Sequence, residues 1–564
     1  MSGDYATHRA DIELMIDEEF YIIEPPHPLV DISVWHLFTV AEDTLRMFFA
    51  GWIPEGKIDP SFVDAYKYSL RHSISHVLKH ALNNKVTLPE KTIPKSYEKS
   101  VMLLEAGKKY ERLSRLVAAT YNSHGKFIKV EGGYELKYHD SLDMRYSVLE
   151  LLGHGADVST DITGILHFWL TSDVPEAHLI FSRMHDSVRI RRKRVTYKYD
   201  AVTTCEIAKH IPQREKIIPD NFDFPWGGSY KTHALINALL IRCFYHILAV
   251  EIAALKYSLK GGGESSLVLI ISREQLCEDL MQLASIANEE VYSFIDMLTF
   301  GRKSKTPDPA LQPLYLSKSN MFMVPCIHIL NSNVQRNILS LMAKTRQKEF
   351  DAQSESFEEH MVSNIKSSLE CWKYFIFNRE FKFNKNKEEI DGLIVDDASK
   401  TVLLLEFRWI LQPGDSREVY NKMKATSSKV DQLNRKIVFF ENNLTEFIKN
   451  SFNGIINVGN PSEWKVQGVV VIQGYGGTAS HESNIPVVTL DVFKKGLKKI
   501  NNLQRLFEWI RDLSWLPTKD KHFTVSIAHE NLGVERISRV AVIPLVDQLQ
   551  YTASLQQSIL SYTT

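Results

Sequence analysis

The stretch that decides the fold is EIDGLIVDDASKTVLLLEFRW, residues 389–409. Two apolar runs flank the turn-forming residues DDAS at 396–399, and this pattern predicts two neighbouring strands joined by a short turn. Asp391 interrupts the first run, and Glu406 lies near the end of the second. An ionised carboxylate is costly to bury unless it is paired or bound to a cation. These two acids are therefore the first candidates for a functional site.

The spacing of the two acids predicts that they lie at the same end of a sheet. Fourteen residues separate them, which is enough for the rest of one strand, the turn and the next strand. Two close carboxylates and an exposed main-chain carbonyl form an incomplete oxygen shell of the kind that Mg²⁺ accepts. A metal held in this way lowers the pKa of a bound water and neutralises charge on a phosphodiester. The alternative is a structural ion pair of Asp391 or Glu406 with Arg408 or Arg435.

The segments around this stretch predict a small mixed sheet flanked by helices. Apolar residues recur every four positions in SESFEEHMVSNIKSSLECW, which predicts a helix, and KYFIFNREFKF (373–383) is strand-like. After the central stretch come an amphipathic segment at 417–437 and strand-like runs at 466–477 and 485–493. The predicted order is therefore helix, three strands, helix and further strands.

With this order and these acids, residues of roughly 350–500 resemble the PD-(D/E)xK phosphodiesterase superfamily, the fold of many restriction and repair nucleases. The resemblance implies that Asp391 is the motif aspartate and that Glu406-Phe407-Arg408 is the E-x-K element. It further implies a Mg²⁺ or Mn²⁺ ion held by Asp391, Glu406 and the main-chain carbonyl of Phe407.

The resemblance also implies two supporting residues on the flanking helices. Glu358, in SFEEH on the preceding helix, is the first choice for an additional acid, and Glu370 is the second. Gln432, in KVDQLNRK, matches a glutamine that would orient substrate or water.

One position departs from the family pattern, because Arg408 stands where a lysine is usual. Lysine can shed its proton or orient a water, whereas arginine stays charged and acts as a fixed fork. Arg408 suits the stabilisation of a phosphate. A lysine of the following helix is expected to take the other role, with Lys422, Lys424 and Lys429 as the available residues.

Composition places the chain among ordinary soluble proteins. Of 564 residues, 44% are hydrophobic and 24% charged, and the net charge is −1. Nucleic-acid binding must therefore come from local patches. The five cysteines are dispersed, the first twenty residues are too polar for a signal peptide, and no run of 18 apolar residues occurs. We expect a cytoplasmic protein with no membrane partner.

The whole chain is predicted to be an α+β multidomain protein with a largely helical N-terminal half. Residues 1–260 would be mostly helical and serve recognition, sensing, or contact with a partner protein or a second copy. The glycine-serine stretch KGGGESS (260–266) is interpreted as a flexible boundary. Residues 261–349 would form a linking α/β segment, 350–510 a restriction-endonuclease-like mixed sheet flanked by helices, and 511–564 a C-terminal extension.

Two further patterns in the N-terminal half are candidate sites. A basic run with tyrosines after it predicts contacts to phosphates and bases; its basic residues are Arg189, Arg191, Arg192, Lys193 and Arg194, and the tyrosines are Tyr197 and Tyr199. His72, His76 and His80 recur at four-residue spacing and could hold a metal, although no HExxH glutamate accompanies them.

These features together predict a metal-dependent nuclease that hydrolyses DNA or RNA, in the manner of bacterial host-defence and restriction effectors. A catalytically degenerate nucleic-acid-binding or assembly subunit is the competing hypothesis, favoured by Arg408. A third is a helical scaffold that touches no nucleic acid.

Overall fold

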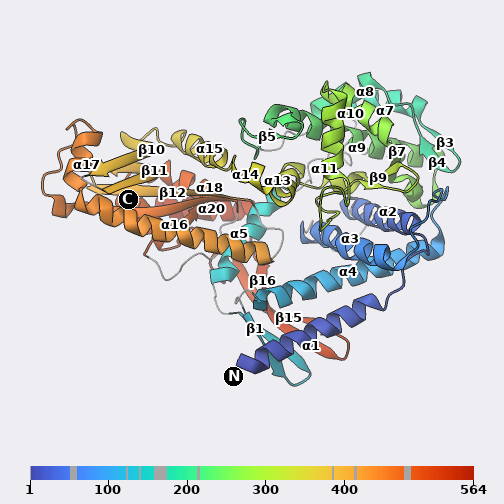
Figure 1. Ribbon diagram of the computed structural model, residues 1–564, viewed down its shortest axis with the longest axis horizontal. Coiled ribbons are helices and arrows are strands. Elements are labelled where there is room, and N and C mark those ends of the chain that lie inside the picture. The colour runs from blue at the N-terminus through green and yellow to red at the C-terminus, as the bar shows by residue number, and fades with distance from the viewer. Residues whose placement is uncertain are drawn as a thin grey trace. The chain divides into compact units, whose positions relative to one another are not determined.

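The computed structural model describes residues 2–50, 60–121, 125–138, 142–157, 175–211, 216–383, 386–411, 416–474 and 484–563 (Figure 1). The chain forms two compact units, both of mixed α and β structure. Unit 1 contains Met1–Arg9, Arg115–Ala156 and Ser354–Thr564, and unit 2 contains Ala10–Ser114 and Asp157–Gln353. Both are assembled from separate stretches of the chain, so this division differs from the four consecutive segments predicted from the sequence.

A five-stranded sheet forms the centre of unit 1. Its order is β10-β11-β12-β13-β14; the β10–β11 and β11–β12 pairs are antiparallel, and the β12–β13 and β13–β14 pairs are parallel. Helix α15 precedes the sheet and α16 connects β12 to β13, so the predicted order of helix, three strands, helix and strand is observed. The bounds are α15 Glu355–Lys366, β10 Tyr374–Phe383, β11 Asn386–Asp396, β12 Thr401–Ile410, α16 Ser416–Asn442, α17 Leu444–Ser451, η2 Pro461–Glu463, β13 Lys465–Gly474 and β14 Val487–Thr489.

The two faces of this sheet are covered by different helices. Alternate residues of β12 point to opposite faces, so Leu403 and Leu405 pack with α15, α18 (Leu490–Leu497) and α19 (Leu503–Arg511). Val402 and Leu404 pack against α16 and α17. Gly468 in β13 lets α16 approach closely, since a Cβ there would lie 2.7 Å from Cγ of Leu433. This close packing fixes the helix that faces the two predicted acids.

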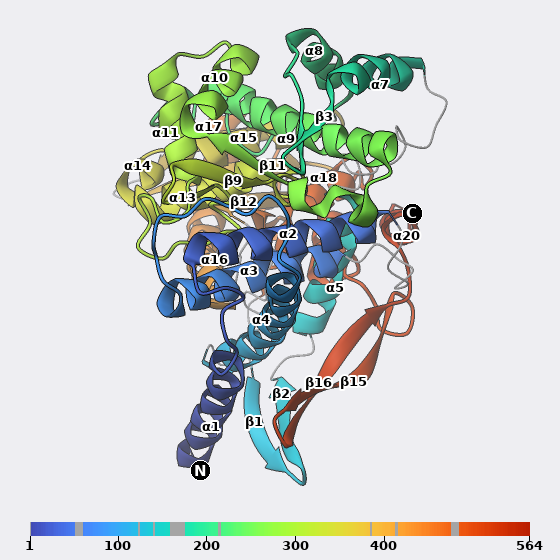
Figure 2. The same cartoon turned by 90° about the vertical axis from the view of Figure 1, so that its right-hand side faces the viewer.

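A second sheet of unit 1 joins residues that are far apart in sequence. Its order is β1-β2-β16-β15, and β2 pairs with β16 in parallel, which places Tyr134 opposite Ile537 (Figure 2). Residues 511–564 are therefore built into unit 1. The bounds are β1 Gly125–Val130, β2 Gly133–Tyr138, α5 Leu142–Asp157, β15 Phe523–Leu532, β16 Glu535–Pro544 and α20 Gln548–Leu560; helices α1 (Ser2–Tyr21) and α4 (Pro94–Tyr121) each have residues in both units.

Unit 2 is mainly helical and is built around the long helix α9 (Ser229–Tyr257), which is largely buried. The bounds of its other helices are α2 Val30–Phe49, α3 Pro60–His80, α7 Pro175–Ser187, α8 Ala201–His210, α10 Arg273–Ala284, α11 Asn288–Leu298, α12 Cys326–Leu330, α13 Val334–Thr345 and α14 Gln347–Asp351. Its strands are β3 Arg189–Arg191, β4 Arg194–Thr196, β5 Asp223–Phe224, β6 Gly227–Gly228, β7 Val268–Ser272, β8 Tyr315–Leu316 and β9 Met321–Pro325.

The glycine-serine stretch after α9 is a packed turn inside unit 2, so its interpretation as a flexible boundary was wrong. It forms the short helix η1 (Lys260–Ser266), in which three consecutive glycines have positive φ. A Cβ on Gly262 would lie 2.6 Å from the guanidinium of Arg46. Ser265 accepts a hydrogen bond from the Thr92 amide, and Ser266 accepts one from the Val195 amide.

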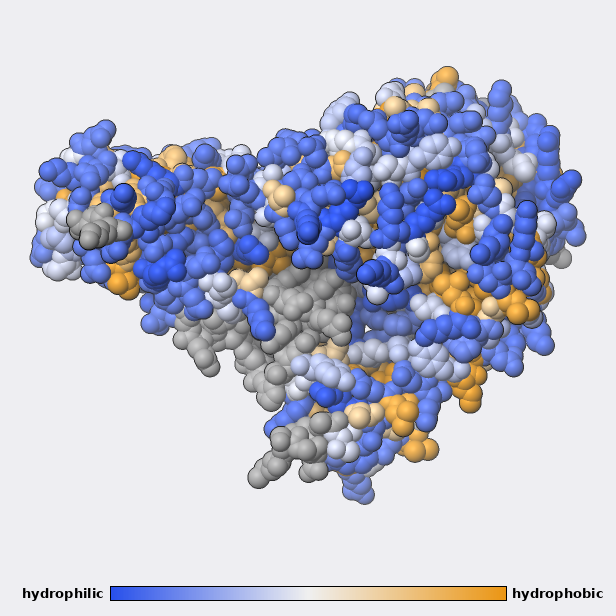
Figure 3. Space-filling view, in the orientation of Figure 1, coloured by the Kyte–Doolittle hydropathy of each residue, from blue (hydrophilic) through white to orange (hydrophobic). Residues whose placement is uncertain are grey.

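Helix α9 is also long and apolar enough to cross a membrane, but 83% of its most apolar window is buried inside the structure. Such burial is typical of the core helix of a soluble protein. The face of the molecule in Figure 3 is mostly hydrophilic, with apolar side chains in scattered patches.

Candidate active site in unit 1

The structure places Asp391 and Glu406 opposite each other where the strand pairing is interrupted. The β11–β12 ladder runs from Asp396–Thr401 to Gly392–Leu405, and the next position in this register is Asp391 opposite Glu406. The ladder ends there. Adjacent side chains on one face of an antiparallel pair lie close together. The two carboxylates lie close together as predicted, since one lysine ammonium group contacts both.

The other neighbour of β11 is interrupted at the same point. The β10–β11 register pairs Phe377 with Gly392 and Arg379 with Ile390, but it has no pair at Asp391. The residue opposite Asp391 is Asn378, whose φ of +49° is in the left-handed region. Neither strand pairing of β11 therefore includes Asp391, and the regular hydrogen-bond ladder of the sheet is interrupted at this residue.

Two lysines of α16 complete the cluster. The Nζ atom of Lys429 lies 3.2 Å from Oδ2 of Asp391 and 3.1 Å from Oε2 of Glu406. Lys436 donates to Oε1 of the same glutamate. The Glu406 side chain is 1% exposed, whereas those of Lys429 and Asp391 are 15% and 22% exposed. One carboxylate therefore lies in the interior, and the other reaches the surface.

The position of these side chains follows from the period of the helix. Lys429, Gln432 and Lys436 are three and four residues apart, so they share one face of α16. Gln432 is half-buried between the two lysines, one turn from each. The structure thus brings Gln432 to the same helix face as the lysines that contact the acids.

The predicted acid on the preceding helix contacts the predicted arginine. Nη1 of Arg408 lies 3.6 Å from Oε1 of Glu358, and the Arg408 side chain is 43% exposed. The rings of Phe357 and Trp409 stack with centroids 3.8 Å apart, which fixes α15 against the end of β12. Burial raises the pKa of Glu358, and the Asp391 and Glu406 carboxylates add to this effect against Lys429 and Arg408. Glu358 thus belongs electrostatically to the cluster.

The charges around the two acids favour the protonated form of Lys429. Burial raises the pKa of Glu406, and the neighbouring Asp391 carboxylate raises it further, against the effect of the two lysines. Burial acts to lower the pKa of Lys429, but the surrounding carboxylates outweigh it and the pKa is raised. In this arrangement Lys429 is an ammonium ion shared by two acids.

Several alternatives from the sequence are resolved by these contacts. Asp391 and Glu406 do not pair with Arg408 or Arg435, since Arg408 contacts Glu358 and Arg435 contacts Glu388 with Nε 2.8 Å from its Oε1. Glu370 is exposed and follows the end of α15. Of the candidate lysines, Lys429 reaches the acids, Lys424 is exposed, and the side chain of Lys422 is outside the described residues.

Lys436 is the residue that the sequence prediction missed. It follows Lys429 by seven residues, a spacing that places both on one face of a helix, and this regularity was the available signal. It is nearly fully buried, which an isolated lysine avoids because of the cost of removing an ammonium group from water.

The donors present fit a hard divalent cation at the two carboxylates. Asp391 and Glu406 supply oxygen atoms around a place that already holds the positive charge of Lys429. The Phe407 amide donates to Oδ2 of Asp391 at 2.8 Å, so its main chain faces β11. The carbonyl of the same residue points to that side too, since strand residues direct both groups the same way. Among the described residues, no three His, Cys, Asp or Glu side chains are grouped as a metal site.

The basic run of the N-terminal half forms the β3–β4 hairpin in unit 2. Its turn has positive φ at Arg192 and Lys193, and the side chains of Arg189, Arg191, Arg192 and Lys193 are exposed. Arg194 is an exception to the prediction: it lies over the Trp35 ring at 4.9 Å and donates to the Pro89 carbonyl.

The other two N-terminal predictions are replaced by structural contacts. Tyr197 and Tyr199 lie against Arg242, so they are not presented for stacking on bases. His72 bonds to Glu111 at 2.6 Å and His76 to the Ile23 carbonyl at 2.6 Å. These contacts, and the tilted contact between the rings of His76 and His80, account for the histidine spacing without a metal.

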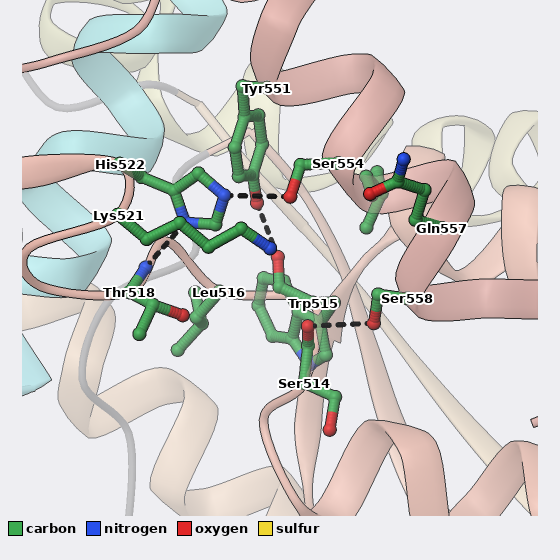
Figure 4. Close-up of a pocket in the computed structure, with 11 residues that line it drawn as sticks. Ser514, Trp515, Leu516, Thr518, Lys521, His522, Tyr551, Ser554, Gln557 and Ser558 are labelled. Atoms are coloured by element: carbon green, nitrogen blue, oxygen red, sulfur yellow. Dashed lines mark hydrogen bonds between the residues drawn. The ribbon is translucent and has the colours of Figure 1, made fainter. Parts of the chain in front are cut away.

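Unit 1 also contains a Ser-His pair of the residue types used in nucleophilic catalysis (Figure 4). His522 Nε2 lies 2.8 Å from Oγ of Ser554 beside a cavity of about 250 Å³. The Thr518 amide donates to Nδ1 of the same histidine at 2.8 Å, so the proton of the neutral ring is on Nε2. Burial lowers the pKa of His522 and keeps the ring neutral. The imidazole therefore donates to Ser554 and cannot accept its proton, which excludes a nucleophile–base pair.

No protein-family model matches this chain, and neither a curated protein nor a solved structure shows a significant match to it.

Proposed function

We propose that unit 1 is a metal-dependent phosphodiesterase that hydrolyses DNA or RNA. The observation that carries the proposal is the cluster of Asp391, Glu406 and Lys429 at the interruption of the strand ladder. The order of helix, three strands, helix and strand around it is also that of the PD-(D/E)xK nucleases. Acids with shifted pKa values are concentrated at functional sites. A buried glutamate with ionic partners, next to an edge that solvent reaches, is therefore typical of an active site.

The roles follow from the donors and from the exposure of each group. Asp391 and Glu406 would hold Mg²⁺ or Mn²⁺ together with the Phe407 carbonyl. Such an ion, when bound, supplies a water of lowered pKa and neutralises charge on the phosphate. Arg408 is exposed enough to contact the phosphate with its planar fork.

Lys429 takes the place of the lysine that is missing from β12. Its Nζ reaches both acids from α16, so it can orient a water or a phosphate oxygen at the same point in space. Gln432, one turn away, would contact substrate or water. Lys436 holds the other oxygen of the buried Glu406 carboxylate. A divalent ion between the acids would require Lys429 to give up at least one of these contacts.

The exposed arginines and lysine of the β3–β4 hairpin would add phosphate contacts. Arg189, Arg191, Arg192 and Lys193 are four positive charges on one short hairpin. Contacts of this kind are independent of base sequence and weaken strongly with salt.

One observation favours the second candidate, a binding or assembly subunit without catalysis. Lys429 and Lys436 supply two positive charges to the two carboxylates, so the cluster is neutral without a metal. In this case Lys429 would be a permanent replacement for the ion, and nucleic acid would be bound intact.

The deciding experiment combines cleavage with metal-induced stabilisation. Plasmid, linear and single-stranded DNA and RNA are incubated with the protein in Mg²⁺, in Mn²⁺ and in EDTA, and the melting temperature is measured with and without Mn²⁺. The test variant is Asp391→Asn. The matched control is Glu388→Gln, on the same strand, whose side chain pairs with Arg435.

A nuclease is expected to cleave only with a divalent ion and to gain melting temperature with Mn²⁺, since a ligand that binds the folded state stabilises it. Both effects should vanish in Asp391→Asn and persist in Glu388→Gln. Intact substrates in all conditions, with no Mn²⁺ effect, would contradict the proposal. Salt-sensitive nucleic-acid binding under those conditions would establish the binding subunit.

A further inference from the structure

Unit 2 contains a cavity of about 530 Å³ that the proposed nuclease chemistry does not use. It lies among β4, the segment after it, α9, β7 and α10, and its volume is in the range of small-molecule sites, roughly 300–1,000 Å³. The β7 residues Val268–Ile271 form an apolar wall. The polar part of the lining includes Tyr197, Arg242 and His246.

The hydrogen bonds in the polar part of the lining have fixed directions. His246 Nε2 lies 2.8 Å from the Ser266 carbonyl, which only accepts, so Nε2 carries the proton. Nδ1 of this ring therefore accepts from the Tyr197 hydroxyl at 2.8 Å. The hydroxyl oxygen in turn accepts from Nη1 of Arg242 at 2.9 Å. Tyr197 and His246 thus form a chain of hydrogen bonds that holds the Arg242 guanidinium in one orientation.

A second support holds the other edge of the same arginine. Nε of Arg242 donates to Oδ2 of Asp279 at 2.6 Å, and Gln275 donates to Oδ1 of Asp279 at 2.9 Å. These contacts use Nε and Nη1, so among the residues that the structure describes Nη2 has no hydrogen-bond partner. The Arg242 side chain is only 5% exposed and lines the cavity. A buried guanidinium held this rigidly loses little entropy on binding an anion.

The charges that face the cavity leave a positive balance. Among the described residues that line the cavity, the charged ones are Arg194, Arg242 and Asp279. Burial lowers the pKa of His246 to about 3, and burial raises the pKa of Tyr197 to about 12, so both are neutral near pH 7. The tyrosine ring of Tyr199, with its centroid 5.0 Å from Cζ of Arg242, is also neutral.

We propose that this cavity binds a small ligand bearing an oxyanion, either a phosphate or a carboxylate. The charged group of the ligand meets Nη2 of Arg242, because that group is fixed in place and carries unused N–H donors. Its apolar part lies along β7. The site is separate from the acid–lysine cluster of unit 1 and does not depend on whether that cluster cleaves nucleic acid.

The test measures binding of pyrophosphate, AMP and citrate to the full chain by titration calorimetry in EDTA, with adenosine as the uncharged comparison. At least one anion is expected to bind with a Kd below about 1 mM, and adenosine at least tenfold more weakly. AMP or pyrophosphate in preference to citrate would identify a phosphate ligand, and the reverse a carboxylate ligand. Glu388→Gln, which alters an ion pair of unit 1 outside the acid–lysine cluster, should leave the affinity unchanged.

Variants of Gln282, an exposed residue at the cavity, provide a matched charge test. Gln282→Glu is expected to weaken anion binding about fivefold and Gln282→Lys to strengthen it by a similar factor. The double change Arg242→Met with Asp279→Leu removes the ion pair as a whole, which avoids an unpaired buried charge, and should abolish binding. The inference is overturned if no anion binds more tightly than adenosine, or if anion affinity is equal in the two Gln282 variants.

Discussion

Among the residues that the structure describes, two glutamates are fully buried, and they differ in the groups that bind their carboxylates. Glu42, on α2 in unit 2, accepts hydrogen bonds from the backbone amides of Ile327 and His328 at 2.7 and 2.8 Å. Glu406, in unit 1, is held by the ammonium groups of Lys429 and Lys436. Backbone amides at the start of α12 cannot leave without unfolding that turn. Lysine side chains can rotate away.

This difference separates a structural carboxylate from one that can exchange its partner. The amides around Glu42 are part of the fold, so its carboxyl group caps the start of α12. The partners of Glu406 are long, rotatable side chains, one of them shared with Asp391 at 22% exposure. A cation can therefore replace Lys429 without loss of backbone structure. The comparison predicts that Glu406 governs activity and that Glu42 governs stability.

The largest expected effect is the loss of cleavage in Glu406→Gln. The amide keeps the shape of the side chain but removes the charge that holds a divalent ion, so the cleavage rate should fall by about 10³-fold or more. The measurement is the initial rate of plasmid nicking in Mg²⁺. Glu42→Gln serves as the control and should cleave at the wild-type rate. Equal activity of the two variants would remove the distinction drawn between the two glutamates.

The next largest effect is expected in Lys429→Met, which should bind the metal more strongly but cleave more slowly. Removing the ammonium group that competes for the two carboxylates should increase the melting-temperature gain produced by Mn²⁺. The cleavage rate should nevertheless fall by about 10²-fold, because the group that orients water or phosphate is lost. Lys436→Met, which leaves Lys429 in place, is the comparison and should show a smaller loss of activity. A reduced Mn²⁺ response in Lys429→Met would show that Lys429 does not occupy the cation position.

The third effect concerns stability at the other glutamate. In Glu42→Gln one of the two amides, of Ile327 or His328, faces an NH₂ group and loses its acceptor. A buried donor without a partner costs about 1–3 kcal/mol, which denaturant titration of the full chain would detect. Glu388→Gln, at a surface pair, is the comparison variant and should be nearly neutral. A wild-type unfolding midpoint in Glu42→Gln would show that these amides do not depend on the carboxylate.

Glu42 should also make the stability depend on pH. Burial raises its pKa from 4.5 to about 8, against the effect of the two amides. The folded state keeps this proton up to about pH 8, whereas the unfolded chain releases it near pH 4.5. The contribution to the free energy of unfolding is therefore complete below pH 4.5 and decreases as the pH rises through 8.

The measurement compares the free energy of unfolding at pH 6.5 and 8.5. The wild type should lose about 1–2 kcal/mol more than Glu42→Gln over this interval. Buried histidines do not affect the comparison, because burial lowers their pKa values and they change stability only below about pH 6.5; among the described residues these are His36, His76, His246, His328 and His522. Identical pH profiles of the two proteins would mean that Glu42 is ionised in the folded state.

The sequence was sufficient to predict the elements whose contacts are local. The length of the hairpin predicted that Asp391 and Glu406 lie at the same end of the sheet, and the register of the two antiparallel strands agrees with this. Lys429 was among the lysines named, since the helix follows the second strand directly. Contacts set by remote segments were beyond this reasoning: Ile537 pairs with Tyr134, and this pairing joins the end of the chain to unit 1.

The same limit explains the residues that were misjudged in unit 2. Tyr197 and Tyr199 follow a basic run and were expected to meet bases, but Arg242 of a later helix lies against both rings. Arg194 belongs to the same run, yet Trp35 covers it. Neither partner is near in sequence, so the pattern of charges and aromatics alone could not distinguish an exposed face from a packed one.

The smallest expected effect is that of Arg435→Ala, and it tests the ionic partners of the acids directly. Arg435 is 64% exposed and pairs with Glu388. Lys436, the next residue in the chain, is nearly fully buried and pairs with Glu406. An exposed ion pair contributes about 0.5 kcal/mol or less, so both stability and cleavage should stay near wild type. The matched change Lys436→Ala leaves a carboxylate partly unpaired in the interior and should cost several times more. If Arg435→Ala abolished cleavage while Lys436→Ala did not, Arg435 would be the arginine that serves the acids, and the lysine cluster would be structural.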